Sequence, residues 1–177
     1  MKCENTDINS KARTNICQNV LAWLKAAHVV LNCVKVNEGK YPLSINEDFT
    51  SFKIYYSDVG LLTSRTSMNP NGIINKINLS DKAKGMMTES YVAEQLTALG
   101  YPLHYWTSNN TAEIDFVIQQ DEYSIPIEVK SADNVKAKSL KTYIEKYNPP
   151  YAIRISVKNF RYENGIKSIP LYAVFCL

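Results

Sequence analysis

Two neighbouring segments of the chain have the composition of buried β-strands and yet carry charged side chains. Residues 113–118 and 124–130 are rich in the β-branched and aromatic residues that strands favour. Because side chains alternate between the two faces of a strand, Glu113 and Asp115 share one face of the first segment, and Glu128 and Lys130 share one face of the second. Each predicted strand therefore has a polar face, which in a packed sheet needs compensating charge.

The two segments are close enough in sequence to form a β-hairpin. A two-residue turn at residues 121–122, or a four-residue loop on the same centre, places Asp115 opposite Glu128, and Glu113 opposite Lys130; a three-residue loop shifts the register by one. Opposed like charges destabilise a sheet, so this pairing predicts that Lys130 or a divalent cation lies between the carboxylates. The alternative is an edge strand whose charged face is solvated.

A third carboxylate is predicted on the buried face of a helix. Residues 85–100 favour a helix that ends at a glycine. Its apolar residues form one stripe: Val92, Ala93, Leu96 and Leu99. Glu89 lies on this stripe, whereas Glu94 lies off it and is expected at the surface. The alternative for Glu89 is a carboxylate near the helix start that the helix dipole favours.

The order of these elements resembles that of a known superfamily. The chain is expected to form a helix with Glu89, a strand at 102–106, the strand with Asp115, the strand with Glu128 and Lys130, a helix ending at 147, and a further strand. This resembles the PD-(D/E)XK nuclease superfamily, whose motif falls on Glu89, Asp115 and the segment 128–130. The resemblance implies an α/β fold with a restriction-endonuclease-like core of helix, three strands, helix and strand around a mixed central sheet.

A narrower resemblance covers most of the chain. It is carried by residues 55–62, 88–96, 111–118, 125–131, 138–141 and 169–173. These segments are similar to the uncharacterised C-terminal domain that follows AAA-type ATPase modules in bacterial and archaeal proteins. One departure is Trp106-Thr107, where the resemblance implies a basic residue after the tryptophan. The chain also has no G-x-x-x-x-G-K-[ST] phosphate loop, so ATP hydrolysis by that route is not expected.

The first fifty residues follow a different pattern. Residues 12–27 predict an amphipathic helix, and residues 29–36 predict a short strand. The expected division is an N-terminal extension over 1–50, which resembles the remnant of a winged helix, and a nuclease-like domain over 51–177. The resemblance suggests a truncated relative of the longer ATPase proteins.

Composition is consistent with nucleic-acid binding without requiring it. The net charge is +3 and the sequence pI is near 8.6. The cysteines at 3, 17, 33 and 176 have no CxxC spacing, which favours a reducing cytoplasm and gives no sign of a zinc site. No apolar run reaches the length of a membrane span.

The function expected from these residues is metal-assisted hydrolysis of phosphodiesters in nucleic acid, with DNA as the favoured substrate. Asp115, Glu128 and Glu89 would hold Mg²⁺ or Mn²⁺, and Lys130 would orient the attacking water or stabilise charge on the phosphate. Glu113 is expected to pair with Lys130 or to lie outside the ligands. One alternative is a catalytically silent module that binds DNA or protein, with an ATPase or a second copy of the chain as partner. Another is a lysine–carboxylate network that only organises the core.

Overall fold

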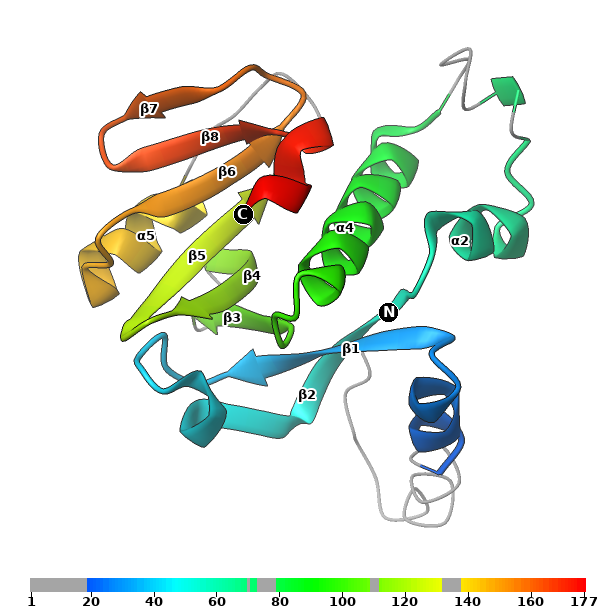
Figure 1. Ribbon diagram of the computed structural model, residues 1–177, viewed down its shortest axis with the longest axis horizontal. Helices are drawn as coiled ribbons and strands as arrows, with labels where there is room; N and C mark the ends of the chain where they lie inside the picture. Colours follow the sequence, from blue (N-terminus) through cyan, green and yellow to red (C-terminus); the bar gives the residue numbers. More distant parts are fainter. Residues whose placement is uncertain (1–18, 70, 73–78, 109–111, 132–137) are drawn as a thin grey trace.

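The structure is a computed structural model that describes residues 19–69, 71–72, 79–108, 112–131 and 138–177. Its centre is one mixed sheet of eight strands in the order β2-β1-β3-β4-β5-β6-β8-β7. Helix α4 lies across one face of this sheet and helix α5 lies on the other, as Figure 1 shows. The expected α/β fold with a mixed sheet is therefore confirmed.

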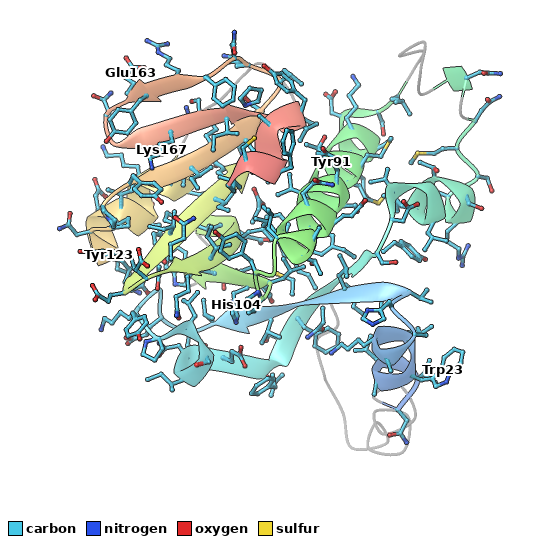
Figure 2. All side chains as sticks on the ribbon, in the orientation of Figure 1. Trp23, Tyr91, His104, Tyr123, Glu163 and Lys167 are labelled. Atoms are coloured by element: carbon cyan, nitrogen blue, oxygen red, sulfur yellow. The ribbon has the colours of Figure 1, made fainter. Side chains whose placement is uncertain are left out.

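The N-terminal part of the described chain forms one end of the sheet. Its elements are the helical residues 19–26, β1 (Val30–Val36), the 3-10 helix η1 (Leu43–Asn46), β2 (Glu47–Tyr56) and α2 (Val59–Arg65). β1 pairs with β2 in antiparallel fashion and with β3 in parallel fashion. The predicted strand at 29–36 is confirmed, while residues 12–18 of the predicted first helix lie outside the described residues. Trp23 projects away from the sheet (Figure 2) and is exposed.

The elements that follow occur in the predicted order. They are α4 (Asp81–Ala98), β3 (His104–Ser108), β4 (Ala112–Gln120), β5 (Tyr123–Val129), α5 (Lys138–Tyr147) and β6 (Ala152–Ser156). A hairpin of β7 (Arg161–Glu163) and β8 (Ile166–Pro170) and the 3-10 helix η2 (Leu171–Cys176) complete the chain. Part of the predicted start of α5, at 135–137, lies outside the described residues.

Local sequence signals explain where α4 begins and ends. The Ser80 hydroxyl accepts a hydrogen bond from the backbone N–H of Ala83 at 3.2 Å, so the helix begins four residues before the predicted start. Gly100 follows the helix with a φ of 85°, as expected of a glycine that terminates it. The prediction that Leu99 lies on the buried stripe was wrong: α4 ends at Ala98, Leu99 is its C-cap residue, and Leu99 is 37% exposed.

Two apolar cores hold the layers together. Residues of α4, including Val92 and Leu96, pack with Phe116 and Ile127 on one face of the sheet. On the other face, residues of α5 pack around Trp106. This packing fixes α4 over the strands that carry the predicted acidic residues, and so fixes the position of Glu89 relative to Asp115.

Candidate acidic site

The β4–β5 hairpin has the register that the sequence predicts. Gln120 pairs with Tyr123 across a two-residue turn, and the ladder continues to the pair of Phe116 and Ile127. Asp121 has a φ of 51° in this turn, a conformation that aspartate tolerates better than most residues. The ladder ends at this pair, so the predicted pairing of Asp115 with Glu128 stays a prediction; Ile114 packs in the core with α5 and Phe116 in the core with α4, which shows that strand alternation is interrupted around Asp115.

Asp115 is fixed by the backbone of β5. Its Oδ2 accepts a hydrogen bond from the backbone N–H of Val129 at 2.7 Å. This short bond to an ionisable group is of the strong, charge-assisted kind when the carboxyl is ionised. The other carboxylate oxygen of Asp115, Oδ1, does not take part in this bond.

Glu128 is the most enclosed of the predicted site residues. Its side chain is 2% exposed, and its Oε1 lies 3.1 Å from Nζ of Lys130, which is 35% exposed. Within the described part of the chain, the buried Oε2 has no hydrogen-bond partner. An unsatisfied buried carboxylate oxygen is costly, so this atom calls for an explanation.

Glu89 comes from α4 and is half-buried rather than turned fully to solvent. Its Oε2 accepts a hydrogen bond from the Tyr55 hydroxyl of β2 at 3.3 Å. Its partner Tyr55 is 8% exposed and belongs to the core on that side of the sheet. The structure thus holds Glu89 at the boundary between core and surface.

The charge of Glu89 acts on the carboxyl of Asp115. Burial raises the pKa of Asp115, and the charge of Glu89 raises it further, to about 7. The Val129 N–H and the charges of Lys53 and Lys130 act in the opposite direction. A carboxyl that burial and a second carboxylate both perturb is typical of functional sites, although structural networks produce the same effect.

Lys53 of β2 belongs to this region and was not singled out from the sequence. It is 8% exposed, and its Nζ lies 2.5 Å from Oε1 of Glu113 and 4.9 Å from the centre of the Tyr105 ring. Burial is the largest single influence and lowers the pKa of Lys53, but the charges of Glu113, Asp115 and Glu89 and the hydrogen bond to Glu113 together outweigh burial, so the net shift is upward.

The ion pair between Lys53 and Glu113 differs from the expected pairing. Glu113 forms an ion pair with Lys53, whereas Lys130 forms an ion pair with Glu128. The physical reason is that β2 supplies the ammonium from beyond β1 and β3, a contact that the hairpin sequence does not contain. The sequence signal that could have identified Lys53 is the alternation of side chains along a strand, because Lys53 lies on the same face of β2 as the buried Tyr55.

A cavity of about 680 Å³ opens between β2, α2 and α4. Glu89 and Glu113 line it together with three cations, Lys53, Arg65 and Lys82. Asp115 and Glu128 are not among its lining residues, so the cavity borders the acidic site on the side of Glu89.

A ready-made metal centre is not evident from geometry alone. Within the described residues, no group of three His, Cys, Asp or Glu side chains is arranged to hold a metal ion.

The same part of the chain contains no helix long and apolar enough to cross a membrane.

The fold and these residues define an α/β domain with acidic side chains on α4 and on the β4–β5 hairpin. A family model described as "Domain of unknown function (DUF4143)" matches residues 84–174, just over half of the 177-residue chain. The chain therefore belongs to this family. The match runs from within α4 into η2 and includes Glu89, Asp115, Glu128 and Lys130. No curated protein and no solved structure matches the chain.

Proposed function

We propose that the domain is a nuclease that hydrolyses phosphodiester bonds, preferably of DNA, with the help of Mg²⁺ or Mn²⁺. The observation that carries the proposal is Glu128, a buried carboxylate beside Lys130 whose Oε2 has no protein partner among the described residues. The order of helix, three strands, helix and strand supports it, because it matches the core expected of the PD-(D/E)XK superfamily.

A divalent ion fits the chemistry of the residues at this site. Hard cations prefer oxygen ligands, and Oε2 of Glu128 offers one at a place where it otherwise carries a desolvation cost. Asp115 and Glu89 supply further carboxylates, and the mutual effect of their charges would be relieved by positive charge. When bound, the ion would polarise a phosphoryl oxygen and acidify an attacking water.

The remaining residues have roles that follow from their contacts. Lys130 is partly exposed and 3.1 Å from Glu128, so its ammonium can orient a water or stabilise negative charge on a phosphate at the surface of the site. The Val129 N–H holds one oxygen of Asp115 in place. Lys53 offsets the charge of Glu113 on the neighbouring side.

A second candidate function is a catalytically silent module that binds DNA or protein, related to the C-terminal domain that follows AAA-type ATPases. Two observations favour it. Asp115 and Glu128 already have partners in Val129 and Lys130, and no three potential ligands among the described residues are grouped as in a metal centre. In this case the acidic residues would serve the stability of the hairpin.

Plasmid nicking separates the two functions. The wild type and Asp115→Asn are compared in Mg²⁺, in Mn²⁺ and with a chelator, and Glu94→Gln serves as the control because Glu94 lies on α4 outside the site. We expect metal-dependent nicking that Asp115→Asn reduces by at least about 100-fold and Glu94→Gln leaves unchanged. Equal nicking by the wild type and Asp115→Asn would refute the proposed nuclease activity. DNA binding without nicking would support the catalytically silent module.

A further inference from the structure

The cavity between β2, α2 and α4 has a charged rim and a mixed wall. Arg65 at the end of α2 and Lys82 in the first turn of α4 are both exposed. Neither forms an ion pair with another residue in the described part of the chain, whereas Lys53, deeper in the cavity, is paired with Glu113. The two rim cations are thus available to an external anion.

Along α4, the rim cation Lys82 lies on the same side of the helix as Glu89. Lys82, Met86 and Glu89 all line the cavity, at a spacing that places them on one face of α4. Glu89 lies seven positions after Lys82, and this step covers about 10 Å along the helix axis. A strand of B-form nucleic acid has one phosphate per roughly 3.4 Å of axis. A bound strand that runs along α4 with one phosphate near Glu89 would therefore bring another of its phosphates within reach of Lys82.

The walls of the cavity carry side chains that suit the sugars and bases of a bound strand. Tyr56 and Met86 line the cavity, Met86 lies between Lys82 and Glu89 along α4, and both remain at least partly accessible. Aromatic and apolar side chains next to cations are the usual surroundings of sugars and bases in bound strands. A simple anion site would not require this partly apolar wall.

We infer that the cavity seats the sugar–phosphate backbone of the nucleic acid on one side of the scissile bond, with Arg65 and Lys82 as phosphate contacts. This inference rests on the proposed function for the position of the scissile phosphate. It adds a binding surface formed by β2 and α2, which lie outside the residues that the family model matches.

The test is binding of a fluorescein-labelled DNA duplex and of its single strand, measured by anisotropy in Ca²⁺ over a range of salt concentrations. The variant is Arg65→Gln/Lys82→Gln. The control is Lys158→Gln/Arg161→Gln, which removes the same charge from exposed positions near β7. We expect the variant to bind the duplex roughly tenfold more weakly, with the slope of log K against log salt reduced in magnitude by about 2. The control should bind like the wild type.

The outcomes distinguish this inference from the proposed catalysis. Binding by Arg65→Gln/Lys82→Gln that equals wild-type binding overturns the inference, even if the wild type nicks plasmid in Mn²⁺. Equal weakening by the control double variant also overturns it, because the effect is then one of net charge. Absence of DNA binding by the wild type overturns it as well. If the wild type never nicks plasmid but only the cavity variant loses binding, the inference stands and the proposed catalysis fails.

Discussion

At the scale of single residues, Lys53 shows how the fold compensates its buried acids. A lysine at 8% exposure is stable as an ammonium only where carboxylates surround it, and Glu113 provides the direct contact. The charges of Asp115 and Glu89 also raise the pKa of Lys53. This lysine therefore ties β2 to β4 across the sheet and is expected to be protonated at neutral pH.

Removal of the Lys53 ammonium should destabilise the protein. We expect Lys53→Met to lower the free energy of unfolding by about 2 kcal/mol, less than for a fully buried pair because Glu113 is 38% exposed and can regain water. Urea unfolding measures the change. Arg161→Met, at an exposed pair with Glu163, is the control and should have no measurable effect. An unchanged stability of Lys53→Met would show that the buried pair makes no net contribution.

The raised pKa of Asp115 predicts a pH dependence in the absence of divalent ions. The folded state keeps this proton up to about pH 7, whereas the unfolded carboxyl loses it near 3.8. The folded state therefore binds more protons between these values, so the contribution of Asp115 to stability falls as the pH rises through this interval. Asp115→Asn should remove the fall and be the more stable protein above pH 7. Parallel stability curves for the two proteins would contradict the raised pKa.

A divalent ion should reverse this alkaline loss of stability in the wild type. Because Mn²⁺ that binds only the folded state stabilises it by mass action, we expect Mn²⁺ to raise the melting temperature of the wild type above pH 7. Asp115→Asn and Glu128→Gln should respond much less, and Glu94→Gln should respond like the wild type. A uniform response of all four proteins would point to nonspecific ion binding.

At the scale of elements, the hairpin was the most predictable part of the site. Strand parity and a two-residue turn were enough to give the register between Gln120 and Tyr123, and the helix pattern was enough to place Glu89 near the sheet. Contacts between distant elements were not predictable in this way. The partner of Glu113 comes from β2, and the hydrogen bond of Glu89 comes from Tyr55, so both depend on how β1 and β2 join the sheet. The burial of Leu99 was misjudged because periodicity does not show where a helix leaves the core.

The turn of the hairpin offers a test at this scale. Asp121 has a positive φ, which β-branched residues adopt at a cost. We expect Asp121→Val to lower the free energy of unfolding by about 1–2 kcal/mol, as measured by urea unfolding. Glu122→Val changes the adjacent exposed turn residue and should cost less. If both variants lose the same stability, the strained position lies elsewhere in the turn.

At the scale of the whole molecule, the sheet joins the N-terminal strands to the strands that carry the acidic site. The boundary expected at residue 50 stays a prediction, and it falls within β2. Cys33 of β1 and Tyr55 of β2 belong to the core that also contains Phe116. A protein made of residues 51–177 would lack β1, which covers the edge of β3.

Truncation tests whether the second part is independent. Because β1 and the first half of β2 contribute to a shared sheet and core, we expect the 51–177 fragment to lose the cooperative thermal unfolding of the full chain. Circular dichroism measured during heating would show this. A fragment that unfolds cooperatively at the same temperature as the full chain would establish residues 51–177 as a separate domain.

The most direct test of the central claim is the position of Mn²⁺ in crystals of the protein, located by its anomalous scattering. The proposed site predicts a peak about 2 Å from carboxylate oxygens of both Asp115 and Glu128, with Glu89 bound directly or through water. Asp115→Asn crystals treated in the same way should lack the peak. Wild-type crystals with Mn²⁺ only at other positions, and with Asp115 and Glu128 still held by Val129 and Lys130 alone, would contradict the claim.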